Sequence, residues 1–557
     1  MWRLRILLVF FYGWFFLIAA RLFYWQVLSS GELSQIAAKQ HLMRLEVLAN
    51  RGEIVSSEGY PIVSNKHAYL VYAEPKKIID KKTTTEKLSQ KLSVDEASIS
   101  GQLNSELFWV PLKHKVDQEI VDALRELKLV GVGFEIENKR YYPEGSMSAQ
   151  LVGFVGSAFD GNPRGYFGLE GYYDRQLRGR VGFLQQAKSA SGNPILAGET
   201  QRIPPQDGST LKLHLDRTVQ FIIEKKLREG LEKYQAKGGT IIVLNPKNGG
   251  ILAMASEPSF DPSVYSDYTQ DRYKNLAISG VYEPGSTFKT IVMAAALEEN
   301  VVKPDTIFEE KGPIPVGGYF IRTWNNKYNG TVTATEILEK SSNVGMVQIE
   351  KLMGGEKLLS YIKKFGFGLE TGVDLDSEES PALRLDNEWK EIDYATLSFG
   401  QGIAVTPLQM VRAVSVLANG GKLFEPHVVA SIISPTGETF DIKPKLVAEI
   451  ITPVTASVIT EMMVQAVDKG EAKFAKPKGY RVAGKTGTAQ IPVAGHYDSE
   501  KTIASFVGFA PADDPKFVML VTLREPTTSP WGSETAAPLF FSIAKELFSY
   551  YAIPPSS

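Results

Sequence analysis

The first 28 residues restrict this chain more than any other part of its 557-residue sequence. Arg3 and Arg5 precede an uncharged apolar run at residues 6–20, and Arg21 is followed by aromatic residues. The run is shorter than the roughly 20 residues that cross a bilayer. Arg21 can nevertheless extend its side chain to the interface, where aromatic rings are also favoured, and this lengthens the usable span. We expect a single-pass anchor at residues 1–28.

The charges around this segment also predict its orientation. Basic residues favour the cytoplasmic side, so Arg3 and Arg5 place the N-terminus in the cytoplasm and the body of the protein outside it. A cleaved signal peptide is the alternative, and it requires small residues before its cleavage site. Leu17 and Ile18 stand there instead, directly before two alanines. We therefore expect a retained anchor in the cytoplasmic (inner) membrane.

Composition removes several classes of function. The chain has no cysteine, which excludes disulfides, thiolate catalysis and cysteine-bound zinc. Its six histidines lack the spacing of metal ligands, so we expect no metal and no cofactor. No G-x-S-x-G turn surrounds any serine, which disfavours a Ser-His-Asp triad. The net charge is −2 and there is no long basic run, so no nucleic-acid partner is expected.

Gly and Pro residues interrupt the sequence in a way that predicts two further domains. Residues 29–205 mix strand-like and helical stretches and contain no plausible catalytic set, which favours a non-catalytic domain. Residues 206–557 follow a linker-like stretch. There, helical spacing of apolar residues predicts a helix at 217–235, and two strand-like runs around Asn245-Pro-Lys-Asn-Gly-Gly predict a hairpin. A helix beside antiparallel strands, with more helices after them, predicts an α+β fold.

The strongest catalytic candidate is the segment Tyr282-Glu-Pro-Gly-Ser-Thr-Phe-Lys289. The apolar run at 290–297 predicts a buried helix, whose start is marked by Pro and Gly. Ser286 and Lys289 therefore share one face of the first turn. A serine hydroxyl needs a neighbouring base to become a nucleophile, and a lysine buried beside a second cation loses its proton more easily. The helix N-terminus offers N–H groups to an oxyanion.

Ser-x-x-Lys alone is a weak signal, because the chain contains it three more times, at Ser209–Lys212, Ser360–Lys363 and Ser542–Lys545. Those three lie in stretches typical of a strand or of the surface of an amphipathic helix. Only Ser286 follows a Pro-Gly entry and precedes an apolar helix, so we select Ser286 as the nucleophile.

A second motif supplies polar groups. Ser341 and Asn343 flank Ser342 between two helix-like stretches. A hydroxyl could relay a proton there, and an amide could hold a carbonyl group or a lysine in place. The alternative is an ordinary polar helix end, which Ser and Asn favour. Ser191-Gly-Asn193 has the same pattern and is expected to be such a turn.

The third motif, Lys485-Thr486-Gly487, occurs once and lies at the end of a strand-like run. Lys485 could be the second cation that lowers the pKa of the base. The hydroxyls of Thr486 and Thr488 could bind a substrate carboxylate. Gly484 and Gly487 would let a ligand approach the backbone. The alternative is a glycine-rich edge strand.

In this order the motifs form the Ser-x-x-Lys, Ser-x-Asn and Lys-Thr-Gly set of penicillin-recognising serine enzymes. Over nearly its whole length the chain resembles the class B penicillin-binding proteins, which are monofunctional peptidoglycan D,D-transpeptidases. Further stretches carry the resemblance: Arg51-Gly-Glu-Ile, Gly168-Leu-Glu-Gly, Ser398-Phe-Gly-Gln-Gly402, Thr406-Pro-Leu-Gln and Ser505-Phe-Val-Gly-Phe-Ala-Pro511. It implies an elongated mixed pedestal, then a penicillin-binding/β-lactamase-like transpeptidase domain with an antiparallel sheet flanked by helices.

The resemblance also implies a role for each motif. Ser286 would attack the D-Ala–D-Ala carbonyl of a stem peptide, with Lys289 as its base. Ser341 would pass the proton on, positioned by Asn343 and Lys485. An amine of a neighbouring stem peptide would then resolve the acyl-enzyme, and β-lactams would acylate the serine stably.

Substrate binding and partners follow from the same resemblance. Thr486, Gly487 and Thr488 would bind the substrate, and the N–H groups of Ser286 and Thr488 would form the oxyanion hole. A membrane-embedded glycan polymerase and division proteins are the expected protein partners.

The division (septal) type resembles this chain more than the elongation type does, because the elongation branch often carries Asp where Asn343 stands. An elongation-type enzyme of the same class stays an alternative. A β-lactamase or a penicillin sensor shares the motifs, but the first needs no pedestal or anchor and the second normally follows several membrane spans. A non-catalytic division scaffold is disfavoured because every catalytic position is occupied.

Overall fold

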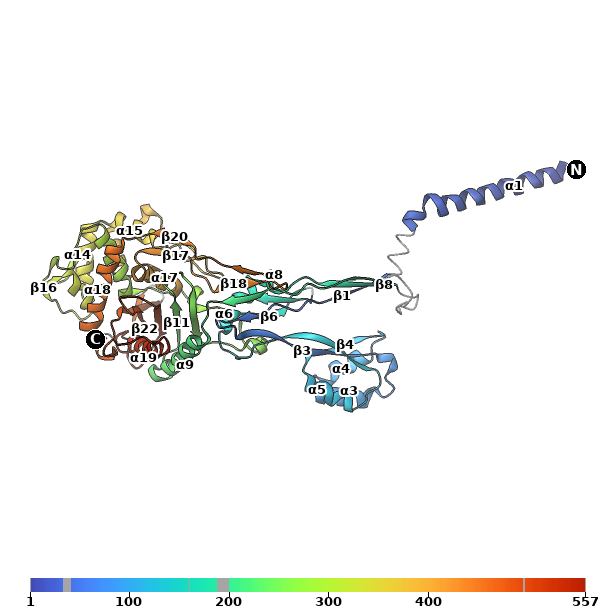
Figure 1. Cartoon of the computed structure of the whole chain (residues 1–557), viewed down its shortest axis with the longest axis horizontal. Helices are drawn as coiled ribbons and strands as arrows, with labels where there is room; N and C mark the ends of the chain where they lie inside the picture. Colours follow the sequence, from blue (N-terminus) through green and yellow to red (C-terminus); the bar gives the residue numbers. More distant parts are fainter. Residues whose placement is uncertain (1, 34–41, 160, 188–199, 494–495, 556–557) are drawn as a thin grey trace. The chain divides into compact units, whose positions relative to one another are not determined.

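The structure is a computed structural model that describes residues 2–33, 42–159, 161–187, 200–493 and 496–555. The chain divides into two compact units, whose elements are labelled in Figure 1. The first unit comprises residues 1–51 and 178–208, and the second comprises residues 52–177 and 209–557.

The first unit contains a long apolar helix and a small sheet. Helix α1 (Trp2–Phe23) continues into a π-helical turn (Tyr24–Leu28), and none of these residues is buried. Among the described residues this is the one helix long and apolar enough to cross a membrane, so it fits a single-pass anchor. The antiparallel sheet has the order β1-β8-β9, with these bounds: Leu42–Val47, Gly182–Ala187 and Thr200–Ile203.

A seven-stranded sheet in the second unit joins strands from both predicted domains. Its order is β19-β18-β10-β2-β3-β4, and β5 also pairs with β3. Strand β10 follows the predicted linker, yet it pairs in parallel with β2, where Leu211 lies opposite Ile54. The strands are β2 (Ile54–Val55), β3 (Pro61–Ala73), β4 (Val110–Val116), β5 (Val132–Tyr141), β10 (Thr210–Leu213), β18 (Val429–Ile433) and β19 (Thr439–Asp441).

Three helices pack against β3, β4 and β5 and close a separate small core. They are α3 (Lys81–Leu92), α4 (Glu96–Leu103) and α5 (Gln118–Glu126). Leu88, Ile99 and Val121 are all 0% exposed within this core, one from each helix. This part belongs to the predicted non-catalytic domain.

A five-stranded antiparallel sheet forms the centre of the second unit, in the order β12-β11-β23-β22-β21. Its strands are β11 (Gly238–Leu244), β12 (Ile251–Glu257), β21 (Ala483–Val493), β22 (His496–Ala510) and β23 (Phe517–Arg524). The predicted hairpin is confirmed as β11 and β12, in which Thr240 lies opposite Ser256.

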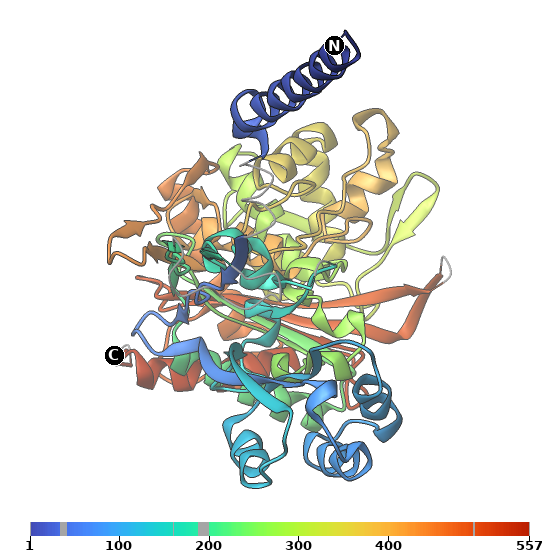
Figure 2. The same ribbon diagram turned by 90° about the vertical axis from the view of Figure 1, so that its right-hand side faces the viewer.

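Both faces of this sheet are covered. Ile241 and Val243 pack with helices α9 (Arg217–Tyr234) and α19 (Ala536–Tyr550), while Ile242 packs on the opposite side with α17 (Pro407–Ala418). Successive residues of a strand point to opposite faces, so a strand buried on both sides is a continuous apolar run. In Figure 2 the red C-terminal helix lies below the sheet and the yellow helices lie above it. The α+β fold is confirmed.

The second unit has further helices and pairs of short strands. The helices are α6 (Ala149–Val152), α7 (Gly168–Tyr172), α8 (Asp174–Leu177), α10 (Gln270–Tyr273), α11 (Leu276–Ser279), α12 (Lys289–Glu298), α13 (Ala334–Glu339), α14 (Asn343–Met353), α15 (Gly355–Lys364), α16 (Glu391–Leu397) and α18 (Pro453–Lys469). The paired short strands are β6 (Phe154–Ser157) with β7 (Pro163–Tyr166), β13 (Ile307–Glu310) with β16 (Gly330–Thr333), β14 (Ile314–Val316) with β15 (Tyr319–Ile321), and β17 (Lys422–Phe424) with β20 (Leu446–Glu449).

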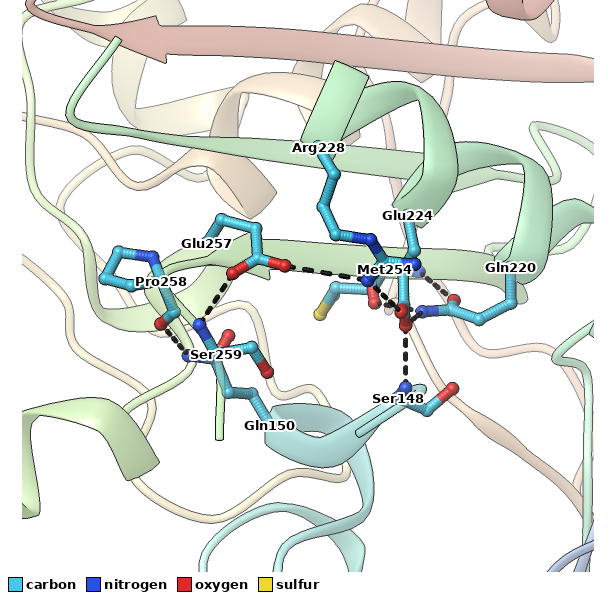
Figure 3. A network of polar contacts seen from close by, with 9 residues as sticks. All are labelled: Ser148, Gln150, Gln220, Glu224, Arg228, Met254, Glu257, Pro258 and Ser259. Atoms are coloured by element: carbon cyan, nitrogen blue, oxygen red, sulfur yellow. Dashed lines mark hydrogen bonds and ion pairs between the residues drawn. The ribbon is translucent and has the colours of Figure 1, made fainter. Parts of the chain in front are cut away.

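A buried polar junction holds the segment before α6 against α9 and β12 (Figure 3). Glu224 on α9 accepts hydrogen bonds from the backbone N–H of Ser148 at 2.7 Å and from the Gln220 amide at 2.8 Å. The same amide donates to the carbonyl oxygen of Met254 at 2.9 Å, and Gln220 Oε1 accepts from the Met254 N–H at 2.8 Å. Two parts of the chain that are remote in sequence are therefore joined by directional bonds.

Candidate active site

The candidate nucleophile lies on a 3₁₀ turn, Gly285–Phe288, that continues directly into α12. Gly285 has φ +56°, and a Cβ there would lie 3.1 Å from the carbonyl oxygen of Thr488. Glycine therefore suits the point where this turn meets β21. Every residue from 289 to 297 is buried, which confirms the predicted buried helix. Ser286 itself is partly exposed.

Lys289 is fully buried and reaches the second motif. Its Nζ lies 2.5 Å from the carbonyl oxygen of Ser341, 2.7 Å from Oδ1 of Asn343 and 3.3 Å from Oγ of Ser341. Burial, and next the charge of Lys485, lower the pKa of Lys289 well below its ordinary value, while two glutamate charges act in the opposite direction. A lysine with a lowered pKa is more often neutral and can accept a proton.

Lys485 on β21 is also buried and shares the same serine. Its Nζ donates to Oγ of Ser341 at 3.0 Å and to the carbonyl oxygen of Thr486 at 3.2 Å. Burial lowers the pKa of Lys485 to about 8, against the charge of Glu471. In the part of the chain that the structure describes, no carboxylate lies within hydrogen-bond distance of Lys289 or Lys485.

The backbone at Ser341 explains how one residue meets two lysines. Ser341 lies between α13 and α14 and has φ +54°, in the left-handed region that few residues other than glycine adopt. The next residue, Ser342, caps α14 by accepting a hydrogen bond from the N–H of Gly345 at 3.1 Å. Such backbone strain is found most often at functional sites.

These groups open onto a cleft of about 280 Å³. Six of the eight predicted site residues line it: Ser286, Ser341, Asn343, Thr486, Gly487 and Thr488. The other two, Lys289 and Lys485, lie buried and contact Ser341. The structure thus brings the three motifs together. Among the described residues Ser286 Oγ has no hydrogen-bond partner, so its role as nucleophile and that of Lys289 as its base stay predictions.

The space beside the motif glycines is filled by the protein itself. A Cβ on Gly484 would lie 2.6 Å from the ring of Phe506. One on Gly487 would lie 2.9 Å from Thr287, on the turn that carries the candidate nucleophile. The position that a side chain would occupy at either glycine is therefore filled by protein, and ligand approach to the backbone there stays a prediction.

The cleft-wall residues that the sequence predictions missed include Trp324, Glu471 and Trp531. The two tryptophan rings pack with centroids 4.9 Å apart. Thr488 Oγ1 accepts a hydrogen bond from the N–H of Gly532 at 2.9 Å, which ties β21 to the loop that carries Trp531. None of the three belongs to a motif, so the sequence contains no local signal for them.

The other Ser-x-x-Lys pairs lie elsewhere, as predicted. Ser209–Lys212 runs into strand β10, Ser360–Lys363 lies on α15, and Ser542–Lys545 lies on α19. None of these residues lines the cleft. Ser191-Gly-Asn193 falls outside the described residues.

Comparison with known families supports the same assignment over most of the chain. Residues 239–547 match the penicillin binding protein transpeptidase domain, and residues 46–213 match the penicillin-binding protein dimerisation domain. A serine beside two buried lysines on this fold is the arrangement of a serine-type acyltransferase.

Individual relatives agree with the family match. The stage V sporulation protein D of Bacillus subtilis is 35% identical over 99% of this chain and 86% of its own. A peptidoglycan D,D-transpeptidase FtsI homolog of Mesostigma viride is 31% identical over 100% and 96%. The crystal structure of penicillin binding protein 3 of Mycobacterium tuberculosis, complexed with aztreonam, has a TM-score of 0.72 at 26% identity and covers 92% of this chain and 98% of its own. The chain belongs to the class B penicillin-binding proteins, the peptidoglycan transpeptidases with a dimerisation domain.

Proposed function

We propose that this chain is a peptidoglycan D,D-transpeptidase of septal cell-wall synthesis that works through an acyl-enzyme on Ser286. The observation that carries the proposal is the pair of buried lysines that share Ser341 beside the cleft. A neutral Lys289 can act as a base, and burial, together with the charge of Lys485, favours that neutral form by lowering the pKa of Lys289.

The first half-reaction forms the acyl-enzyme. Lys289 takes the hydroxyl proton of Ser286 while Oγ attacks the carbonyl carbon between the two D-alanines of a stem peptide. The C–N bond breaks, and terminal D-alanine leaves with a proton passed on through Ser341. The N–H groups of Ser286 and Thr488 stabilise the oxyanion.

The second half-reaction makes the cross-link. An amine of a neighbouring stem peptide attacks the ester carbonyl, the new C–N bond forms, and the bond to Ser286 Oγ breaks. The proton of the amine returns to Ser286 Oγ. A β-lactam forms the same ester, and its ring-opened product blocks this second step.

Location and organisation complete the proposal. Helix α1 anchors the chain with its N-terminus in the cytoplasm, which Arg3 and Arg5 support, and the transpeptidase domain is extracytoplasmic. Residues 1–28 form the anchor, 29–205 the pedestal and 206–557 the catalytic domain. A membrane-embedded glycan polymerase and division proteins are the partners at the septum.

A fluorescent penicillin tests the site on the full chain in detergent. The wild type should be labelled covalently, Ser286→Ala should lose the label, and Ser360→Ala, which alters an exposed serine of the same pattern on α15, should keep it. Labelling of the Ser286→Ala variant would refute the site, and rapid loss of the label from the wild type would favour a β-lactamase.

Depletion of the protein tests the septal role. Cells should elongate without dividing, because only the septal wall lacks cross-links. Rounded cells that still divide would assign the chain to elongation instead.

A further inference from the structure

A second cavity adjoins the catalytic cleft. It has a volume of about 370 Å³, and Trp324 and Glu471 line both spaces. The cavity continues away from Ser286 between the segment that follows β15 and the end of α18, where Lys473 and Phe474 line it. A transpeptidase needs room for two peptides, and the cleft alone accounts for the one that acylates the serine.

The lining of this second cavity carries excess positive charge. Its four lysines are Lys327, Lys340, Lys469 and Lys473, against two glutamates. Lys469 lies 3.2 Å from Glu339, and Lys340, which directly follows α13, lies 3.6 Å from Glu336 on that helix. Lys327 and Lys473 have no ion-pair partner among the residues that the structure describes. Two uncompensated ammonium groups in one cavity suit a ligand that carries carboxylate.

Glu471 is the complementary feature. It is the one ionisable residue among the described residues that line the catalytic cleft, and it is exposed. It also lines a small cavity together with Ser341 and Lys485. The side chain therefore lies where the second cavity opens toward the catalytic residues. A carboxylate in that position favours a bound ammonium group.

The acceptor of a transpeptidase arrives as an ammonium ion, and nothing else in the cleft wall compensates a positive charge. We propose that the second cavity is the acceptor subsite, where Glu471 holds the acceptor ammonium and Lys327 and Lys473 hold a carboxylate close to it. The acceptor class is thus an α-amino acid terminus, in which both groups share one carbon, and not a simple alkyl amine. This inference rests on the proposed function.

The chemistry of the step balances without another reagent. The ammonium gives one proton to water as it leaves the Glu471 carboxylate for the ester. Its nitrogen then attacks the carbonyl carbon, the C–N bond forms and the C–O bond to Ser286 breaks. The second proton of the nitrogen reaches Ser286 Oγ through Lys289, so the enzyme returns to its starting state.

A thioester analogue of the D-Ala–D-Ala donor tests the subsite on the full chain in detergent. Each acyl-enzyme partitions between water and an added amine, and mass spectrometry gives the ratio of amide to acid. D-alanine and ethylamine form a matched pair, because they differ in the carboxylate and share the same carbon skeleton otherwise. D-alanine is also the group that leaves in the first half-reaction, so a wild-type preference for it of about tenfold supports the subsite only if loss of the two lysines abolishes that preference.

The variants separate the two roles. Glu471→Gln should lower the amide-to-acid ratio about tenfold with both amines while the acyl-enzyme still forms. The double variant Lys327→Met and Lys473→Met should lower the amide-to-acid ratio with D-alanine. The ratio with ethylamine should stay unchanged. Glu461→Gln is the control, since this exposed carboxylate lies on α18 and pairs with Arg481 at 2.8 Å.

Three outcomes would overturn the subsite: equal use of both amines by the wild type, an unchanged preference for D-alanine in the double lysine variant, or an unchanged ratio in Glu471→Gln. Retained penicillin labelling shows that each variant is folded. Absence of any acyl-enzyme in the wild type would instead refute the proposed function, and the acceptor subsite with it.

Discussion

Two polar clusters in the second unit lie at similar depth and differ in how their charges are compensated. At the junction in Figure 3, Glu224 is 8% exposed and accepts bonds from Ser148 and Gln220 at 2.7 and 2.8 Å. Its charge is compensated by Arg228, whose guanidinium lies 3.3 Å from the carboxylate. Beneath the cleft, Lys289 and Lys485 are 0% and 4% exposed. Among the described residues neither ammonium group meets a carboxylate, and both contact Ser341.

The difference shows that burial alone does not make a side chain reactive. Glu224 is fixed by donors from two parts of the chain, so its carboxylate links those two segments. The lysines are held by neutral oxygens only. Burial lowers the pKa of both, and the charge of Lys485 lowers that of Lys289 further. Groups with such shifted pKa values are those that catalysis uses.

The largest effect is expected when the reactive cluster loses its base. Lys289→Met keeps an unbranched apolar stem but removes the nitrogen that accepts the proton of Ser286. Acylation by penicillin should slow by at least about a thousandfold, in line with the loss of a general base. Stopped-flow measurement of the labelling rate checks this.

Lys363→Met is the matched control for that experiment. This exposed lysine ends a Ser-x-x-Lys pair on α15 and pairs with Asp386 at 2.5 Å. Its rate should equal that of the wild type. A Lys289→Met rate within tenfold of the wild type would show that another group activates Ser286.

A smaller effect, on stability, is expected at the junction. Glu224→Ala removes the acceptor of the Ser148 N–H and should lower the free energy of unfolding by about 2–3 kcal/mol. Burial raises the pKa of Glu224, so ionisation of its carboxylate opposes folding at neutral pH. Glu224→Gln keeps an acceptor without the charge and should cost less than about 1 kcal/mol.

Denaturant unfolding at pH 7 measures both variants. Glu229→Ala, at an exposed position on the same helix, should leave the unfolding curve unchanged. Equal losses in Glu224→Ala and Glu224→Gln would mean that the charge, and not hydrogen bonding, holds this junction.

Local signals explain which parts of the molecule the sequence predicts. The apolar run after Lys289 predicts a buried helix because its apolar residues lie within a few turns of one another. The β11–β12 hairpin is predicted because Asn and Gly mark its turn. The motifs predict the site because their order, and the single occurrence of Lys485-Thr486-Gly487, select Ser286 from four Ser-x-x-Lys pairs.

What the sequence does not predict depends on contacts between remote residues. Pairing of Leu211 with Ile54 joins the two predicted domains in one sheet, and no turn signal or periodicity in the sequence predicts this pairing. Trp324 and Trp531 meet only in the fold. No sequence signal distinguishes Glu471 from the other glutamates, and only its position in the lining of two cavities does so.

The smallest expected effect is a change in the pH dependence of acylation, and it tests whether the charge of Lys485 matters. Because burial lowers the pKa of Lys485 to about 8, its charge is present below that pH and lost above it. Burial and the charge of Lys485 lower the pKa of Lys289 well below its ordinary value, which favours its neutral form as the base. The acylation rate of the wild type should therefore fall about tenfold between pH 7 and pH 9. Lys485→Arg keeps a charge at both pH values, so its rate should be nearly constant whatever its absolute size.

The rate ratio between the two pH values isolates this effect from any misfit of the longer side chain. Thermal unfolding at both pH values shows that each protein stays folded. If the ratio is the same in the wild type and in Lys485→Arg, the falling limb belongs to another group. The two buried lysines would then act on Ser341 through hydrogen bonds alone, and the contrast with Glu224 would be one of geometry and not of charge.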